Sequence, residues 1–418
     1  IGGEISMWSV LGKVSLSTSI MTGIVALYKS VRGRLKEQKR ERFIDARAKV
    51  KSSRHELTAK VIKYYSLDEE NILLHPADYC FPEPIPLDNV KLELIADDSS
   101  QEIIEFYTKK FRRFWPDAAK TYSDAVNLME KPGTDKFYDG LSYRLISIDQ
   151  DGECLKMTFS RASYFQYFNT GEALVFTEAL QINSNSNFKY RKYFPKTLDF
   201  KKHIFTPGIQ TLSIRLSEDR KSAQFYFLSR DLDKVAASGG LLCLLPAGEF
   251  QPATRDSDEI LDLSLWHNIM RESVEEFLNR EVNQNVDDKY DYSDTPFPEL
   301  IKAKEDGEIA VWLLGYGACP LNYKLDFLTV CIYSAETFDN IFGEYKAGKP
   351  NAEGTIYARP IPFTGHEISS YLNINRTATT AVACLKLAYK HREKLGIPCV
   401  DDPGTNLDIK INYERYGK

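Results

Sequence analysis

The chain has 418 residues, of which 43% are hydrophobic and 27% are charged, and its formal net charge at pH 7 is −5. This composition excludes a disordered or fibrous protein, and the net charge gives no general reason to expect nucleic-acid binding. Seven cysteines without a CxxC pair, several of them in apolar runs, indicate reduced thiols of a cytosolic protein and disfavour a zinc site.

Residues 1–70 predict a helical arm. Residues 5–28 are largely uncharged, but Lys13 and many hydroxyl side chains dilute their apolar character, whereas a membrane span needs about 20 mainly apolar residues. One interpretation is a helix that packs on its own protein or on a partner chain, including a second copy in a homo-oligomer. The other is an anchor that holds a cytoplasmic protein at the inner face of the membrane.

The Lys/Arg-rich residues 29–63 predict one long helix, because few helix breakers occur beyond Gly33. Its basic face is either a solvated surface or a surface that attracts anionic lipid or nucleic acid. No helix-turn-helix pattern is present in the arm, so the sequence gives no clear nucleic-acid partner.

Residues 75–200 predict an α+β module, which follows a linker marked by four prolines between positions 76 and 86. Strands are expected near 90–95, 143–148 and 155–159, and helices over 100–114 and 121–129.

Residues 205–395 predict a second domain, and residues 396–418 a C-terminal tail. Buried-type strands are expected at 211–216, 223–230, 241–245, 310–314, 327–333 and 354–361. Helices are expected at 261–279, 365–373 and 377–394. Strands interleaved with helices favour an α/β sandwich, so the fold class is α/β in the broad sense (α+β), with a mixed sheet between helical layers.

A cluster of charged residues on the helix over 261–279 carries the candidate chemistry. Arg271 precedes Glu275 by four positions, and Glu272 precedes Glu276 by four, so three carboxylates and an arginine share about one helical turn. Hard divalent cations such as Mg²⁺ and Mn²⁺ prefer oxygen ligands of this kind. A solvated helix rich in glutamate is the alternative interpretation.

The run Arg271-Glu-Ser-Val-Glu-Glu resembles the REx₂EE core of the Nudix box, and Leu244-Leu-Pro-Ala-Gly-Glu resembles the strand and glycine turn that precede that box. The segment from Asn351 to Phe363, followed by a helix, is similar to the family's late strand. The loop between Gly248 and Arg271 is longer than the usual box, with Asp262 as its nearest acidic residue. Phe277-Leu-Asn stands where the box normally has a glycine.

Over about residues 75–395 the chain also resembles a long Nudix-like architecture that is fused to helix-turn-helix regulators in actinobacteria. This second resemblance rests on the phrases Thr121-Tyr-Ser-Asp-Ala, Tyr143-Arg-Leu, Tyr164-Phe, Thr170-Gly-Glu-Ala-Leu and Pro246-Ala-Gly-Glu-Phe-Gln-Pro. It implies that residues 75–200 are a module specific to that architecture.

The Nudix resemblance implies that Glu272, Glu275 and Glu276 bind Mg²⁺ or Mn²⁺, with Arg271 as their structural partner. Glu275, Glu276 and the distal Glu353 are then the expected catalytic carboxylates. The function it implies is a hydrolase that cleaves the pyrophosphate of a nucleoside diphosphate linked to another moiety. The alternative is an inactive domain that binds such a nucleotide and signals to the arm as a sensor or effector.

Overall fold

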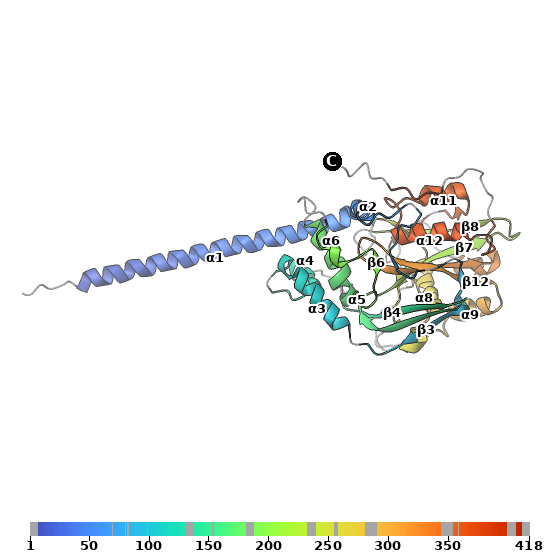
Figure 1. Cartoon of the computed structure of the whole chain (residues 1–418), viewed down its shortest axis with the longest axis horizontal. Helices are drawn as coiled ribbons and strands as arrows, with labels where there is room; N and C mark the ends of the chain where they lie inside the picture. The colour runs from blue at the N-terminus through green and yellow to red at the C-terminus, as the bar shows by residue number, and fades with distance from the viewer. Residues whose placement is uncertain are drawn as a thin grey trace, which may run out of the picture.

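The computed structural model describes residues 7–411, with side chains of the first helix described from Val25 onwards. The ranges 131–136, 181–187, 232–239, 255–257, 281–290, 344–353 and 399–406 lie outside the description, as do the single residues 69, 80, 82, 98, 117, 153 and 358. The described chain forms a body of helices and sheets, from which one long helix projects (Figure 1).

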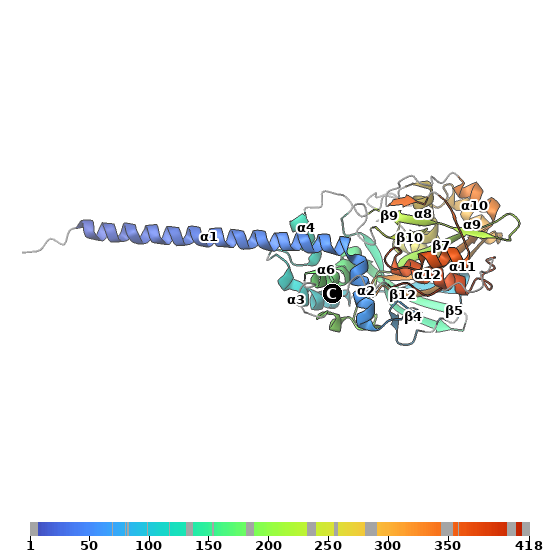
Figure 2. The same ribbon diagram turned by 90° about the horizontal axis from the view of Figure 1, so that it is seen from above.

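The projecting helix α1 (Met7–Ser52) has 46 residues, which corresponds to roughly 69 Å at a rise of 1.5 Å per residue. The chain leaves helical geometry at Ser53 (φ −117°), and α2 (Arg54–Tyr65) then runs across the body (Figure 2). The prediction of one continuous helix over 29–63 is therefore wrong, because the helix is interrupted at Ser53. The physical reason is burial, because Leu57, Val61 and Ile62 of α2 turn into the core.

Among the helices that the structure describes, none combines the length and the apolar character required to cross a lipid bilayer. The membrane contact expected for residues 5–28 stays a prediction.

The module after the arm contains a three-stranded sheet. Its strands lie in the order β3 (Val90–Leu94), β5 (Cys154–Ser163) and β4 (Leu141–Asp151), with β3 parallel to β5 and β4 antiparallel to it. Helices α3 (Ser100–Phe111) and α4 (Tyr122–Glu130) follow the sequence prediction closely. Short 3₁₀ turns lie at Leu87–Asn89, Arg112–Phe114 and Arg191–Tyr193.

A continuous helical segment that the sequence did not predict follows β5. It comprises α5 (Tyr164–Tyr167), a π-helical turn (Phe168–Glu172) and α6 (Ala173–Ala179). Nearly all of it is buried, so it lacks the polar face that would reveal an amphipathic helix in the sequence.

The largest sheet holds seven strands of the described chain. Its order is β15 (Ile361–Pro362), β8 (Ala223–Phe225), β7 (Gly208–Leu216), β13 (Leu325–Tyr333), β12 (Ile309–Ala318) and β2 (Ile85–Pro86), and β11 (Ala247–Glu249) pairs with one end of β7. The central strands β7 and β13 are parallel, and their neighbours are antiparallel. The segment β2 from the preceding module thus completes one edge of this sheet.

Two smaller sheets contain the remaining described strands. One sheet has the order β10 (Leu242–Leu244), β9 (Phe227–Arg230) and β14 (Gly354–Ile356), and β1 (His75–Pro76) pairs with β6 (Thr197–Leu198). The single strand predicted over 223–230 is therefore two strands in different sheets, divided at Tyr226. The strand predicted over 354–361 likewise divides into β14 and β15.

Helices cover both faces of the large sheet (Figure 1). On one face Thr380 of α12 (Thr379–Lys390) donates a hydrogen bond of 2.6 Å to Asp326 of β13. Asp326 is in register with Gly208 of β7, whereas Arg215 of β7 is an odd number of residues away and points to the other face. There Arg215 pairs with Asp339 of α10 (Ala335–Phe342) at 2.7 Å.

Helices α8 (Leu265–Leu278) and α9 (Phe297–Glu305) lie near α10, and α11 (Gly365–Tyr371) lies beside α12 (Figure 2). The short helix α7 (Glu259–Asp262) precedes α8 in the chain. The result is a mixed sheet between helical layers, so the predicted α+β class is confirmed. The sequence did not predict α9 and α10, which are only nine and eight residues long.

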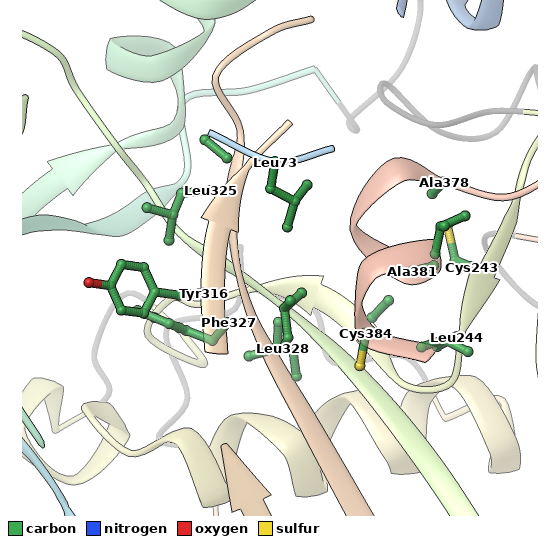
Figure 3. Packing of buried hydrophobic residues seen from close by; sticks show 14 of the residues in the cluster. Leu73, Cys243, Leu244, Tyr316, Leu325, Phe327, Leu328, Ala378, Ala381 and Cys384 are labelled. Carbon is green, nitrogen blue, oxygen red and sulfur yellow. The ribbon is translucent and has the colours of Figure 1, made fainter. Parts of the chain in front are cut away.

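The core between α12 and the strands is apolar and closely packed. Ala381 and Cys384 of α12 point toward Leu328, Cys243 and Leu244 (Figure 3), and all five side chains are at most 2% exposed. This packing fixes the position of β13, whose carboxylate Asp326 lies beside the candidate site.

Candidate functional site

The predicted carboxylate helix is α8, and it lies against the short strand β11. Ser264 caps the helix by accepting a hydrogen bond from the backbone N–H of His267 at 3.2 Å, and Asn279 ends it in the left-handed conformation. Ile269, Val274 and Phe277 are buried in the core. The polar side chains Asn268, Glu272 and Glu276 follow at spacings of four, so they form one row along the helix.

Glu272 lies directly over Gly248 of β11. A Cβ atom added at Gly248 would lie 2.1 Å from Glu272 Oε2, so any other residue there would push the carboxylate aside. Asn268 Nδ2 donates a hydrogen bond of 3.3 Å to Glu272 Oε1. The Glu272 carboxylate therefore occupies the space that the missing side chain of Gly248 leaves.

Glu276 holds the backbone of Ala247, the residue before that glycine. Its Oε2 atom accepts a hydrogen bond of 3.1 Å from the Ala247 N–H. Arg230 Nη2 donates to the Ala247 carbonyl at 2.7 Å and lies 4.0 Å from Glu276 Oε1. Glu276 is only 3% exposed, and together with Arg230 it fixes strand β11 on the helix.

Arg271 stabilises the long loop between β11 and α8. Its Nη2 atom donates to the carbonyl of Gln251 at 2.7 Å, and its Nη1 atom lies 3.7 Å from Asp262 Oδ1. Asp262 also accepts hydrogen bonds from the Ala253 N–H at 2.8 Å and from the Tyr292 hydroxyl at 2.7 Å. Burial would lower the pKa of Arg271, but the charges of Tyr292, Asp262, Glu272 and Glu275 raise it overall.

The predicted site residues are therefore brought together only in part. Glu272 and Glu276 contact β11, Glu275 is half-buried one position before Glu276, and Arg271 contacts the loop between β11 and α8. Glu353 lies outside the described residues. Asp262, which the sequence offered only as the nearest acidic residue, is the partner of Arg271, because the turn α7 returns it to the helix.

A second group of polar residues, which the sequence did not predict, surrounds the end of β11. Lys324 pairs with Glu249 and donates to the carbonyl of Thr206 at 2.6 Å. Asp326 lies in register with Gly208, and a Cβ there would meet both Asp326 Oδ1 at 2.6 Å and the Gly248 carbonyl at 2.7 Å. Burial raises the pKa of Asp326, and Lys324 opposes this. Glu249 stands in the quoted Pro-Ala-Gly-Glu motif, whereas nothing in the sequence pattern marked Lys324 or Asp326.

The side chains as placed do not fit the expected Mg²⁺ or Mn²⁺. Glu276 is occupied by the Ala247 N–H and lies near Arg230, and Glu272 lies against Gly248. Within the described ranges, no group of three or more His, Cys, Asp or Glu side chains is arranged to hold a metal ion. A metal would have to displace the contacts that hold β11 on α8.

The loop between β12 and β13 links this region to the arm. The ammonium group of Lys324, the last residue of the loop, contacts Glu249. The backbone N–H of Lys324 donates to Asn322 Oδ1 at 3.3 Å. Asn322 Nδ2 donates to Glu172 at 2.7 Å, and Glu172 pairs with Arg54, the first residue of α2, at 3.0 Å. Burial would raise the pKa of Glu172, but Arg54 and Asn322 lower it overall.

A second buried ion pair holds the same loop. Arg191 Nη2 lies 2.8 Å from Glu178 Oε2, and the guanidinium also donates to the carbonyls of Pro320 and Leu321. The hydroxyl of Tyr323 lies 3.3 Å from that of Tyr65 in α2. The loop therefore contacts the arm, the buried helical segment and the end of β11.

No protein-family model matches the chain, and no curated protein matches it. The resemblance to the Nudix family therefore rests on the quoted motifs and stays a prediction.

Proposed function

We propose that residues 205–395 form a Nudix-like domain that binds a nucleotide without turning it over and signals its occupancy to the N-terminal arm. The nucleotide class, a nucleoside diphosphate linked to another moiety, is the one that the resemblance implies. The observation that carries the proposal is the polar connection from Glu249 through Lys324, Asn322 and Glu172 to Arg54.

The connection is suited to transmit a displacement because its central ion pair is buried. Arg54 and Glu172 are 9% and 3% exposed. Breaking such a pair by removing one partner costs about 3–5 kcal/mol, so the groups are expected to move together. A ligand shifts the arm only if it binds one arrangement of this loop more tightly than the other.

The test uses full-length protein with two readouts. Thermal unfolding is measured with ADP-ribose, NAD and dinucleoside polyphosphates, each with and without Mg²⁺, because a ligand that binds only the folded state raises the melting temperature. Hydrogen exchange at the α1–α2 junction reports the arm. We expect one nucleotide to raise the melting temperature and change exchange near Ser53, without product formation.

Matched variants separate signalling from binding. Glu249→Gln should keep the melting-temperature shift and lose the exchange change, because it weakens the contact with Lys324. Glu305→Gln, at an exposed position of α9, should behave as the unaltered chain. Binding that leaves exchange at the junction unchanged in the unaltered chain would refute the signalling part of the proposal.

The second candidate function is the pyrophosphate hydrolase. It is supported by the grouping of Glu272, Glu275 and Glu276 on α8, and it requires Glu272 and Glu276 to leave their contacts with β11 in order to bind a metal. Incubation with the same nucleotides and Mg²⁺ or Mn²⁺ tests it. Metal-dependent cleavage that both Glu275→Gln and Glu276→Gln abolish would favour the enzyme and contradict the sensor.

The arm is the proposed output of the signal. Residues 5–28 would contact the inner face of the membrane, with the body in the cytoplasm, or would pair with a second copy of the chain. Sedimentation velocity of the full-length protein without detergent distinguishes a self-associating arm from a single chain, and flotation with vesicles detects the membrane contact.

A further inference from the structure

The basic residues of the arm form two groups that are used differently. Beyond Arg42 toward the body, Phe43 is 2% exposed and its ring lies 4.6 Å from that of Phe176 in α6. Arg47 donates to the hydroxyl of Tyr122 at 3.1 Å, and Arg54 is buried against Glu172. These basic side chains serve the internal packing of the protein.

Residues 25–42 belong to the projecting part of α1 and are those whose side chains the structure describes there. Their charged side chains are directed to solvent. This segment contains seven Lys or Arg and two Glu, a net charge of +5, in a chain whose total is −5. The rest of the chain therefore carries −10. All seven basic side chains are exposed except Lys39, which is half-buried.

The same segment exposes large apolar side chains. Tyr28, Val31 and Leu35 are 62%, 48% and 60% exposed, and their spacings of three and four place them on one side of the helix. Val25 and Leu27 are also exposed, at 48% and 66%. Monomeric proteins rarely leave such a row uncovered, so it indicates a binding surface.

We infer that residues 25–42 bind an anionic lipid surface, with the apolar row entering the headgroup boundary and the flanking Lys and Arg contacting phosphate and carboxylate groups. Clusters of Lys and Arg attract anionic bilayers, and exposed apolar side chains beside them add contact with the headgroup boundary. A nucleic acid would pair with the charges but would leave Tyr28, Val31 and Leu35 uncovered. A second copy would cover the row but would bring two helices of charge +5 side by side.

This inference deepens the proposed membrane contact of the arm, but it involves a different segment and a different chemistry. Insertion of residues 5–28 would depend on apolar character and would be insensitive to lipid charge. Binding through residues 25–42 requires anionic lipid and weakens with salt, because exposed charges are screened.

The experiment is co-sedimentation of full-length protein with vesicles of phosphatidylcholine alone and with vesicles that also contain phosphatidylserine. The test variant replaces Lys29, Arg32, Arg34 and Lys36 with Gln. The matched control replaces Lys201, Lys202, Arg220 and Lys221 with Gln, four exposed basic residues of the body. All eight positions are exposed, so circular dichroism and melting temperature should not change.

We expect the unaltered chain and the control to bind phosphatidylserine vesicles and to be released by salt. The test variant should bind at least about tenfold more weakly, since each basic residue near an anionic surface contributes measurably to affinity. Val31→Ser with Leu35→Ser should also weaken binding.

Four outcomes would overturn the inference. Equal binding to both vesicle types, unaffected by the test variant, would favour insertion of residues 5–28. It would contradict binding of residues 25–42 to anionic lipid. No binding to either vesicle type would contradict both the insertion of residues 5–28 and the binding of residues 25–42 to anionic lipid. Duplex DNA that binds tightly and displaces the vesicles, or a dimer that Val31→Ser with Leu35→Ser dissociates, would assign the segment to nucleic acid or to a second copy.

Discussion

Arg54 Nη2 lies 3.0 Å from Glu172 Oε1 although the two residues are 118 positions apart in the chain. Arg54 begins α2 directly after the chain turns at Ser53, and Glu172 ends the π-helical turn. The Tyr167 hydroxyl and the Asn322 amide also donate to Glu172, at 3.3 and 2.7 Å. One carboxylate thus joins the base of the arm to the β12–β13 loop.

Glu172→Leu should lower the free energy of unfolding by about 3–5 kcal/mol, because it leaves Arg54 buried without its counter-charge. Urea unfolding of the full-length chain measures this loss. The matched control is Glu37→Leu on the exposed part of α1, where the pair with Arg40 is solvated and is expected to contribute about 0–1 kcal/mol. Equal losses in the two variants would show that Arg54 and Glu172 do not form a structural pair.

The same carboxylate predicts a dependence of stability on pH. The pKa of Glu172 is lowered below its ordinary value of 4.5, since Arg54 and Asn322 outweigh the effect of burial. The ionised pair therefore stabilises the folded chain above the unfolded-state pKa, and this contribution is lost as the pH falls through the folded-state pKa. The difference in unfolding free energy between the unaltered chain and Glu172→Gln should be largest near neutral pH and shrink in acid. A difference that is constant with pH would contradict the lowered pKa.

Gly248→Ala should displace the Glu272 carboxylate, because the new Cβ would occupy its position. The variant and Glu272→Ala should therefore be strongly coupled, and the double variant should be more stable than the sum of the single losses predicts. A double-mutant cycle measures this, with an expected coupling of about 0.5–3 kcal/mol. Gly33→Ala is the control, since nothing lies within 4 Å of a Cβ there and alanine stabilises a helix interior by up to about 1 kcal/mol. Additive effects of Gly248→Ala and Glu272→Ala would contradict the close approach.

Asp262→Leu should release the loop between β11 and α8. The variant removes the acceptor of the Ala253 N–H and leaves Arg271 without its acidic partner in that loop. Hydrogen exchange of the Ala253 amide should become faster by at least about tenfold, since a lost buried hydrogen bond corresponds to roughly 1–3 kcal/mol. Asp258→Leu provides the comparison, because Asp258 caps the short helix α7 at an exposed position. Unchanged exchange at Ala253 in Asp262→Leu would remove Asp262 from this structural role.

The helix α8 and the central strands could be predicted because their patterns are local. The apolar residues of α8 recur with the helical period, β7 alternates apolar and polar residues over 211–216, and β13 is a mainly apolar run of the length of a buried strand. The environment of Glu276 could not be predicted, since it depends on the pairing of β11 with β7 and on Arg230 from another sheet. Glu276, which the resemblance implied as a metal ligand, accepts a hydrogen bond from the Ala247 N–H. Lys324 and Asp326 were missed for the same reason, because strand register determines which side chains meet.

The pairing of Ile85 with Leu313 has a consequence for how the chain can be divided. Ile85 belongs to the segment before residue 200, yet it forms the border of a sheet whose other strands lie after residue 205. A protein shortened to begin at residue 205 would leave β12 with an uncovered edge, which is a template for aggregation. Expression of the second half alone should therefore require the stretch around residues 72–90 to be supplied, either in the same polypeptide or as a complementing peptide.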